Sequence, residues 1–549
     1  LVRSLLQRVE KSDNSNSYRL SGPISDAEYQ ALLALSEPHL ATEGSISTSQ
    51  SNREAAPAVR DTTCQINLVT KSIAEAKIAS DTVILALDFG TAMSKAFATD
   101  GGDENLLSLA LGRISGHTDT IFSLSSSIFI TDDGKVYFGP DAINKSMQSG
   151  NKNRKRFDSP KQHLSQSEIN NLFDSFPDIS INPTSTRISC GDLLTLYLAY
   201  FTDMACSELE NSHKKSRYVK RRFTLPHWRQ ERAEWADKSL REMLSLAQIL
   251  ADTLSQRWHE GLAVDQLKNL VDAARALPET PTSLITQGVY EATAAATSCF
   301  KDAPSGRRSY YVIVDVGAGT TDFAAFCVVR RADSDRPTVS RLSDTLKTLT
   351  QAGDTIDTIL RNYIIKQTGL NHGDSYFDRI NTRLSLEIRS YKEILFKEGI
   401  LNYVLADETT GEILLENFLK SEFMERFTNQ LHRKFKEVVE AISPSWHEEL
   451  SEKGLNLVFT GGGATMPMVK DLANLPVKLS GLTINIREAH SIPNWFEQDH
   501  PELLEEFNKL AVCIGATADE LPRELGEFVE FTGNAPPARK GFDTVYRGN

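Results

Sequence analysis

The chain has 549 residues, 40% of them hydrophobic, so it can bury a large core and is long enough for three or four domains. Its 60 basic and 73 acidic side chains give a net charge of −13, which argues against a dedicated nucleic-acid-binding protein. The sequence has no hydrophobic run of the roughly 18 residues that a membrane span needs, and no secretory signal at its start. We therefore expect a cytoplasmic protein without membrane contacts.

The cysteines are scattered, without a Cys-x-x-Cys pair or a histidine at metal-binding spacing. This pattern argues against a zinc site and a disulfide framework, and it favours reduced thiols in the core. The cysteines are Cys64, Cys190, Cys206, Cys299, Cys327 and Cys513.

The N-terminal part is predicted to be a helical segment followed by a linker. In residues 1–40, Ser25 and Glu28 form a capping-box pattern before the apolar stripe of YQALLALS. Residues 41–81 are rich in Ser, Thr, Ala, Glu and Gln and contain few large apolar side chains, which is typical of a linker. The folded body is therefore predicted to begin at Thr82.

The body is predicted to be a mixed α/β structure. Strand patterns occur at 83–87 and 94–99, and a hairpin is predicted to turn at residues 132–134. The predicted helices are 190–211, 231–254, 263–277, 354–367, 383–396 and 418–442. A second strand pair is predicted at 310–326, a further strand at 455–459 and a last helix at 510–521.

One local pattern occurs twice in the body. A buried strand ends on Asp, any residue and Gly, and a Thr follows before the next strand. The pattern reads ALDFGT around Asp88 and VDVGAGT around Asp315. The two aspartates are about one domain length apart, which indicates duplicated halves that face each other.

The glycines of both turns indicate phosphate binding. They remove side-chain bulk and permit a positive φ, so backbone N–H groups can approach phosphate oxygens closely. Neighbouring hydroxyl groups add hydrogen-bond donors. The predicted phosphate-binding residues are Gly90, Thr91 and Ser94 in the first turn, and Gly317, Ala318, Gly319 and Thr320 in the second.

The aspartates of the two turns imply a divalent cation. A carboxylate at this place would repel a phosphate unless a cation lay between them. Asp88 and Asp315 are therefore predicted to bind Mg²⁺, mostly through its water ligands. Asp322, which follows the second turn, is predicted to orient a nucleophilic water or another water of the ion.

A third motif, the run Gly461, Gly462 and Gly463, follows the strand at 455–459. A backbone without side chains is flat enough for a base or ribose to lie against it, and Pro467 favours a helix start just beyond. Each motif alone is a weak signal. Their order and separation together predict a nucleotide-binding site.

These motifs resemble the ATPase superfamily of actin, the sugar kinases and the DnaK-type heat-shock chaperones, and they are most similar to the DnaK type. DFGTAMSK resembles that family's first phosphate motif, DVGAGTTDF its second, and GGGATMPMV its adenosine motif. RFTLPHWRQERAEW resembles the junction that carries a switch proline, here Pro226. YEATAAATSCF resembles the helix start that carries a hinge acid, here Glu291.

The resemblance covers residues 82–521 and implies an actin-like ATPase fold: two duplicated ribonuclease H-like lobes, 82–306 and 307–521, around a nucleotide cleft. It implies in-line hydrolysis of ATP to ADP with Mg²⁺. The implied catalytic residues are Asp88, Asp315, Asp322, Glu291 and Lys161, with Lys155 as an alternative to Lys161. The implied nucleotide contacts add Gly353 from QAGDTID, Lys392 from EIRSYKEILF, and Gly461, Gly462, Gly463 and Thr465.

Several positions depart from the family pattern. Ala92 and Met93 stand where the first motif usually carries a hydroxyl and an aromatic residue. Ala292 replaces a proline after the hinge acid, and Thr465 replaces an arginine that covers the adenine. We therefore expect slow turnover or modest nucleotide affinity.

Two segments indicate how the chain could bind a protein partner. Residues 255–284 exceed the family's usual length and are predicted to be an inserted helical hairpin, while the polar tail 522–549 is too short for a peptide-binding domain. We therefore expect a nucleotide-dependent conformational switch, whose protein partner binds the N-terminal segment or the insert. An actin-like filament, a small-molecule kinase and a fold that binds nucleotide without hydrolysing it are alternative predictions.

Overall fold

The computed structural model describes residues 9–11, 18–20 and 67–526, the last range with short gaps at 103–104, 115–120, 150–152, 167–170, 229, 302, 305, 332–335, 372–373 and 375. The chain is a mixed α/β structure, as predicted. It divides into two compact units, Leu1–Cys64 and Gln65–Asn549. The second unit contains every predicted nucleotide-binding motif.

The first unit differs from the predicted helix where it is described. Val9–Lys11 (β1) and Tyr18–Leu20 (β2) form an antiparallel strand pair. The sequence between these strands contains Asn14 and Asn16, a residue type that favours turns over helix interiors. The predicted capping box at Ser25 lies outside the described residues.

The second unit begins before Thr82, because part of the predicted linker packs onto it. This part includes a short helix, Lys71–Glu75 (α3). The backbone N–H of Val69 donates to Thr253 Oγ1 over 2.9 Å, and Ala76 is buried. The predicted boundary at residue 81 is therefore too late.

The first large sheet has the strand order β12-β10-β3-β4-β5, and β6 also pairs with β4. Strands β3, β10 and β12 are mutually parallel, β4 is antiparallel to β3, and β5 is antiparallel to β4. The bounds are Val83–Asp88 (β3), Met93–Asp100 (β4), Leu106–Ser108 (β5), Leu124–Ser125 (β6), Lys220–Leu225 (β10) and Ile285–Tyr290 (β12).

The second large sheet has the order β22-β19-β13-β14-β15-β23, and β16 also pairs with β14. From β22 to β15 it repeats the order and the strand directions of the first sheet. The bounds are Arg307–Val316 (β13), Thr321–Arg330 (β14), Thr338–Leu342 (β15), Lys347–Leu349 (β16), Leu455–Thr460 (β19), Ile486–Glu488 (β22) and Arg523–Leu525 (β23). Because β23 pairs with β15, the folded body extends past the predicted boundary at 521.

A smaller sheet of order β11-β8-β7-β9 belongs to the N-terminal half of this unit (residues 67–301). Its bounds are Ser127–Ile130 (β7), Lys135–Phe138 (β8), Phe157–Asp158 (β9) and Leu262–Ala263 (β11). In β7 and β8, Ile130 pairs with Val136, and Gly134 has a φ of +79°. The predicted hairpin at residues 132–134 is therefore confirmed.

The segment 255–284 contains one α-helix, so the predicted helical hairpin is wrong. Val264–Arg275 (α9) lies between β11 and a pair of prolines, Pro278 and Pro281, which disfavour further helix. The short 3₁₀ helices Trp258–Glu260 and Thr282–Leu284 flank it. Because β11 pairs with β8 and one face of α9 is buried, this segment is part of the N-terminal half's core.

The predicted helices 190–211, 231–254 and 354–367 occur nearly as predicted, and a capping box of Ser189 and Asp192 starts the first of them. The predicted helix 383–396 begins earlier, at Phe377, the predicted helix 418–442 is divided into two, and the last predicted helix, 510–521, spans Phe507–Ala516. The N-terminal half contains Leu111–Ile114 (α4), Gly139–Gln148 (α5), Gln162–Gln166 (α6), Cys190–His213 (α7), Gln230–Leu254 (α8) and Glu291–Cys299 (α10). The C-terminal half (residues 306–526) contains Gly353–Thr368 (α11), Phe377–Glu398 (α12), Leu415–Leu419 (α13), Glu422–Glu440 (α14), His447–Lys453 (α15), Pro467–Lys470 (α16), Asn494–Asp499 (α17) and Phe507–Ala516 (α18). Two strand pairs complete this half, Ile400–Val404 (β17) with Thr410–Leu414 (β18), and Val477–Leu479 (β20) with Leu482–Ile484 (β21).

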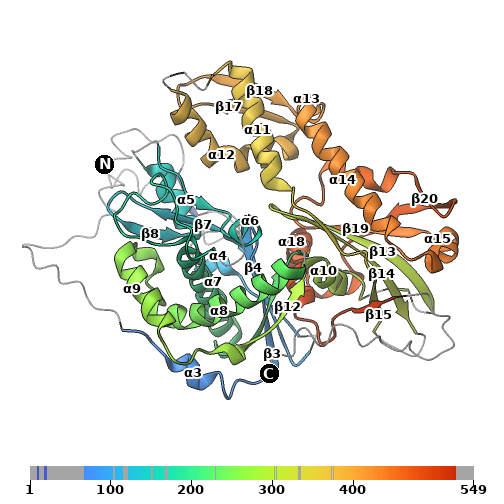
Figure 1. Cartoon of the computed structure of the whole chain (residues 1–549), viewed down its shortest axis with the longest axis horizontal. Coiled ribbons are helices and arrows are strands. Elements are labelled where there is room, and N and C mark those ends of the chain that lie inside the picture. Colours follow the sequence, from blue (N-terminus) through green and yellow to red (C-terminus); the bar gives the residue numbers. More distant parts are fainter. Residues whose placement is uncertain are drawn as a thin grey trace, which may run out of the picture. The chain divides into compact units, whose positions relative to one another are not determined.

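The two halves share a central hydrophobic cluster. It contains residues of β3 and β4, residues of β13 and β14, and the helices α10 and α18 (Figure 1). A Cβ added to Gly515 would lie only 1.7 Å from the carbonyl oxygen of Ala294, so the backbones of the two helices are in contact. Ser298 Oγ also donates to the carbonyl oxygen of Ala511 over 2.9 Å. Small residues thus let α10 and α18 pack closely where the halves meet.

The five cysteines in the described residues are buried free thiols, as predicted: Cys190, Cys206, Cys299, Cys327 and Cys513. Cys64 lies outside the described residues. In the part of the chain that the structure describes, no helix combines the length and hydropathy that a membrane crossing needs.

Candidate functional site

The first predicted phosphate turn joins β3 to β4. The hydroxyl of Ser126 donates to the carbonyl oxygen of Gly90 over 2.8 Å, and its backbone N–H donates to the carbonyl oxygen of Ala92 over 2.8 Å. A Cβ at Gly90 would lie 2.0 Å from the carbonyl oxygen of Met93. Gly90 is therefore required for close backbone approach. A positive φ is not the reason, because Gly90 does not adopt one.

Ser94 does not belong to the surface of this turn, so its prediction as a phosphate donor is corrected. Its side chain is fully buried, and its Oγ lies 3.0 Å from Ser126 Oγ. The hydroxyl of Tyr197 donates to it over 3.1 Å. The predicted donors Thr91 and Thr320 remain partly exposed on their turns.

The carboxylates Asp88 and Asp315 occupy equivalent places in the two large sheets. Thr224 at the end of β10 donates to Asp88 Oδ1 over 2.7 Å, and Thr460 at the end of β19 donates to Asp315 Oδ1 over 2.9 Å. In each sheet the threonine lies on the parallel neighbour of the strand that carries the aspartate. Lys95 Nζ also pairs with Asp88 Oδ2 at 3.2 Å.

The two phosphate turns lie against each other. A Cβ added to Gly319 would be 2.5 Å from Thr91 Oγ1, which belongs to the other turn. Gly317 closes its own turn by donating its N–H to the carbonyl oxygen of Thr320 over 3.0 Å. The glycines of the second turn also lack a positive φ. Glycine is favoured there because neighbouring atoms leave little room for a side chain, and not because of the backbone conformation.

Asp322 lies beside this contact and accepts a hydrogen bond from the other half of the molecule. It pairs with Asp315 in the β13–β14 register and accepts a hydrogen bond from the hydroxyl of Thr348. It also accepts from the backbone N–H of His227 over 3.3 Å. His227 follows Pro226, the predicted switch proline, so the segment just after β10 in one half contacts Asp322 in the other.

Glu291 and Lys161 meet in the same region. Glu291 is the first residue of α10, and its Oε1 lies 2.5 Å from Lys161 Nζ. Both side chains are buried, with exposed fractions of 8% and 5%. The alternative, Lys155, is exposed, and its N–H donates to the carbonyl oxygen of Ser180. The structure therefore brings Lys161, and not Lys155, to Glu291.

The glycine run after β19 packs against β13. Gly461 has a φ of +82°, and its Cβ would lie 2.4 Å from the carbonyl oxygen of Val316. Gly463 donates its N–H to the same oxygen over 2.9 Å. Gly462 and Thr465 are exposed. Two of the three glycines thus hold the loop in place, and the third leaves open backbone on its surface.

Gly353 starts α11 directly behind the second turn, where its N–H donates to the carbonyl oxygen of Gly317 over 3.2 Å. Lys392 Nζ donates to the carbonyl oxygen of Gly353 over 3.1 Å and pairs with Asp357 Oδ1 at 2.9 Å. Lys392 is buried, so in this conformation its ammonium group fixes the first turn of α11.

The carboxyl groups of the cluster differ in acidity. Burial and the nearby charge of Glu291 raise the pKa of Asp315 to about 7 and that of Asp322 to about 8. Burial also acts to raise the pKa of Asp88, but the neighbouring ammonium groups, Lys95 first, outweigh it and hold that pKa below its usual value. The cluster therefore has more buried acid than its lysines neutralise.

This surplus of acid fits a hard divalent cation. Asp322 Oδ2 is buried and has no hydrogen-bond partner among the described residues, so it can still accept one. Within those residues, no three His, Cys, Asp or Glu side chains are spaced to hold a metal ion directly. Mg²⁺ keeps most of its water ligands in proteins, and Asp88 and Asp315 are the residues that would hold it through them.

The raised pKa values predict a pH-dependent stability in the metal-free protein. The folded-state pKa of Asp315 and Asp322 exceed the unfolded carboxyl value of about 3.9. Their contribution to stability is therefore complete below that value and is lost as the pH rises through about 7 to 8. Asp322→Asn should remove part of this loss and raise the unfolding temperature at about pH 8.5 by roughly 2–4 °C.

Thermal unfolding in a chelator, at about pH 5.5 and about pH 8.5, measures this effect. Asp499→Asn is the control, because Asp499 is exposed on α17. An equal shift at both pH values in the Asp322 variant would contradict the assignment.

Sequence reasoning missed several residues of this cluster. Lys95 is the only charged side chain in the interior of the apolar strand β4, and that contrast is a usable signal. Thr224 and Thr460 end strands next to motif residues, but nothing local marks them as partners of the aspartates. Asp354 belongs to the QAGDTID motif that the resemblance singles out, but nothing in the sequence predicts its hydrogen bonds with Ser159 and Gln162.

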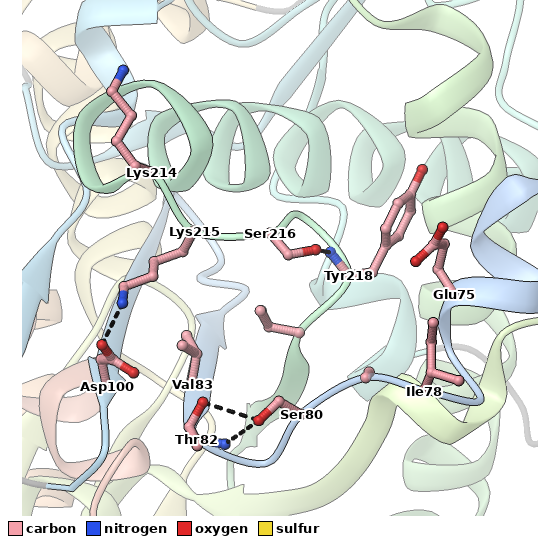
Figure 2. Close-up of a pocket in the computed structure, with 12 residues that line it drawn as sticks. Glu75, Ile78, Ser80, Thr82, Val83, Asp100, Lys214, Lys215, Ser216 and Tyr218 are labelled. Atoms are coloured by element: carbon pink, nitrogen blue, oxygen red, sulfur yellow. Dashed lines mark hydrogen bonds and ion pairs between the residues drawn. The ribbon is translucent and has the colours of Figure 1, made fainter.

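A separate cavity of about 310 Å³ lies on the N-terminal half. It is lined by residues near α3, β3 and the end of α7 (Figure 2). Lys215 and Asp100 form an ion pair of 2.5 Å on one side of it, and Tyr218 and Glu75 lie on another. Its lining residues belong to none of the three predicted motifs. This cavity is therefore distinct from the cluster of turns.

No family model matches this sequence, and no curated protein sequence is significantly similar to it.

Proposed function

We propose that this chain is an actin-like ATPase module of the DnaK type, which binds and hydrolyses Mg·ATP between two ribonuclease H-like lobes. The contact between the two Asp-x-Gly turns, with Gly319 against Thr91, carries the proposal. Each turn follows a strand that carries a buried aspartate at its last residue, Asp88, or next to its last residue, Asp315. Two facing glycine turns with acids at their bases suit a triphosphate bound together with a divalent cation.

The repeated sheet topology supports the proposed lobes. The strand order β12-β10-β3-β4-β5 of the first large sheet recurs as β22-β19-β13-β14-β15 in the second, with the same directions. The equivalence reaches individual hydrogen bonds, since Thr224 binds Asp88 as Thr460 binds Asp315. Lobe I then corresponds to the N-terminal half and lobe II to the C-terminal half.

In the proposed reaction, Thr91, Thr320 and the backbone N–H groups of the turns bind phosphate oxygens. Glu291 holds the ammonium group of Lys161 beside the turns, where Lys161 can orient the attacking water. The unpartnered Oδ2 of Asp322 can accept a hydrogen bond from that water. Mg²⁺, when bound, would neutralise charge on the transferred phosphoryl group and the leaving ADP.

The nucleoside would lie along the exposed backbone of Gly462, near Thr465. Both residues are on the loop that packs against β13, so they are close to Asp315. Thr465 offers a hydroxyl in place of a planar guanidinium, which is consistent with a modest affinity for the base.

The module would act as a switch, because nucleotide that contacts both turns favours the closed arrangement of the lobes. A protein partner would read this arrangement through the N-terminal unit or the 255–284 segment. In the latter, α9 buries one face and exposes a polar one that includes Asp265, Asn269 and Asp272.

Equilibrium binding of a fluorescent ATP analogue, together with phosphate release from ATP, tests the proposal. We expect saturable binding and slow phosphate release with Mg²⁺, and at least a tenfold loss of release in excess chelator. Sedimentation in ATP and in ADP should give small species in both. The absence of saturable binding would overturn the nucleotide site, and ATP-dependent filaments would overturn the switch.

A further inference from the structure

We propose that Asp354 is a positioning residue, which ties the loop carrying Lys161 to the second phosphate turn, so that this loop is held from both sides, and Lys161 is firmly positioned, only while the two halves are closed. The proposal rests on the ATPase function proposed above and concerns the regulation of that same site. The Lys161 loop is defined here as residues 159–162.

Asp354 is rigidly connected to the second turn. It is the second residue of α11, and its backbone N–H donates to the carbonyl oxygen of Ala318 over 2.8 Å. The preceding N–H, of Gly353, donates to the carbonyl oxygen of Gly317. Two successive backbone hydrogen bonds therefore join the start of α11 to the turn, and any displacement of the turn moves Asp354.

The carboxylate of Asp354 accepts hydrogen bonds from the Lys161 loop, which belongs to the opposite half of the molecule. Gln162 Nε2 donates to Asp354 Oδ2 over 2.6 Å, and Ser159 Oγ donates to the same oxygen over 3.0 Å. The other oxygen, Oδ1, lies 3.3 Å from Arg389 Nη2, which fixes the carboxylate within its own half. The residues immediately around Lys161 are thus hydrogen-bonded across the junction.

The same loop is also tied to the first turn. Ser159 donates its N–H to the carbonyl oxygen of Ser126 over 3.0 Å, and Ser126 in turn holds Gly90 and Ala92. Ser159 has a φ of +56°, a conformation that serine rarely adopts unless surrounding contacts impose it. The loop therefore depends on contacts to both phosphate turns for its shape.

Lys161 lies between the two residues that Asp354 holds, and it is itself buried against Glu291. When the halves separate, the hydrogen bonds from Gln162 and Ser159 to Asp354 break, because those two residues belong to the other half. The loop then keeps its connection to the first turn and the Lys161–Glu291 ion pair, both within the N-terminal half, but it loses the contacts that hold it from the other half, and Lys161 is less firmly fixed. Phosphate release would thereby require closure around nucleotide.

Chemical labelling of Lys161 tests the proposal without any need for hydrolysis. In the nucleotide-free full chain, an amine-acylating reagent should modify Lys161 about tenfold faster in Asp354→Ala than in wild type, the effect of losing charge-assisted hydrogen bonds. Peptide mass spectrometry measures the rate at this lysine. Asp378→Ala is the matched control, because Asp378 is an exposed acid in the first turn of α12.

Kinetics provide the second measurement. Asp354→Ala should lower kcat for phosphate release about 10- to 100-fold, with the Kd for ATP changed less than threefold, whereas partial unfolding would weaken both. Asp354→Asn keeps an acceptor oxygen and should recover part of kcat. Adding Gln162→Ala to Asp354→Ala should cause little further loss of kcat, because the Gln162 contact is already gone once Asp354 is replaced.

The outcomes separate this proposal from the ATPase proposal. Faster labelling of Lys161 in Asp354→Ala supports the positioning role even if the wild type releases no phosphate, a result that would overturn only the hydrolysis. If Asp354→Ala matches Asp378→Ala in both labelling and kcat, the positioning role is overturned while the ATPase stands. Circular dichroism confirms that each variant is folded.

Discussion

Asp315→Asn is expected to lower the rate of phosphate release from ATP at least about 100-fold while the protein stays folded. Asp315 is buried at the base of the second turn, and its Oδ1 accepts a hydrogen bond from Thr460. Asparagine has the same shape, and its amide oxygen can keep that hydrogen bond. The substitution therefore removes the charge and little else.

The loss should appear in kcat under saturating ATP, with Mg²⁺ present, because the charge is proposed to hold the ion that neutralises the transferred phosphoryl group. Asp374→Asn is the control, since Asp374 is an exposed acid in the same half. Equal phosphate release by Asp315→Asn and wild type would show that Asp315 does not serve a metal ion in the reaction.

Gly515→Ala is expected to cost about 3 kcal/mol of unfolding free energy, at the upper end of the range for overpacked cores. A Cβ at this position would lie 1.7 Å from the carbonyl oxygen of Ala294 and 2.6 Å from its carbonyl carbon. Both are backbone atoms of α10, so no side-chain rotation can relieve the contact. The helices α10 and α18 would have to move apart, and the central cluster would lose packing on both sides.

Urea unfolding measures this cost as a lower midpoint. The control is Gly462→Ala, because nothing lies within 4 Å of a Cβ at that position and its φ is not positive. We expect the control to unfold at the wild-type midpoint. If Gly515→Ala also does so, the close contact between α10 and α18 does not contribute to stability in solution.

The sequence predicts those features of the fold that depend on residues close together in the chain. The turns at Asp88 and Asp315 and the hairpin at residues 132–134 occur where their Gly and apolar patterns place them. The periodic helices α7, α8 and α11 also begin within one residue of their predicted starts. Local periodicity and turn chemistry are sufficient for these elements because both act between near neighbours in the chain.

Contacts between distant residues account for what the sequence could not predict. The hydrogen bonds from Thr224 to Asp88 and from Gln162 to Asp354 join segments that only the tertiary fold brings together. Ser94 illustrates a different difficulty, because successive residues of a strand point to opposite faces. Knowing that β4 is a strand does not reveal that Ser94 faces Tyr197 and Lys95 faces Asp88.

The errors at the boundaries have a similar origin. Residues 67–80 have a linker-like composition, yet Val69 and Ala76 find partners on α8 and its surroundings. In the same way, Arg523–Leu525 is a polar stretch that pairs its backbone with β15. The composition of a segment indicates how much apolar surface it can bury by itself. It does not predict whether the segment pairs with an open strand edge, or packs into a groove, elsewhere in the protein.

The shared central cluster has a consequence for how the chain is made. The cluster joins residues of β3 near the start of the body to residues of α18 near its end. A growing polypeptide therefore cannot complete this cluster until Ala516 has left the ribosome, although each large sheet has a hydrophobic core of its own. During synthesis the apolar faces of β3 and β4 stay uncovered until α18 has been made. They are the surfaces that a nascent chain would present to chaperones or to other nascent chains.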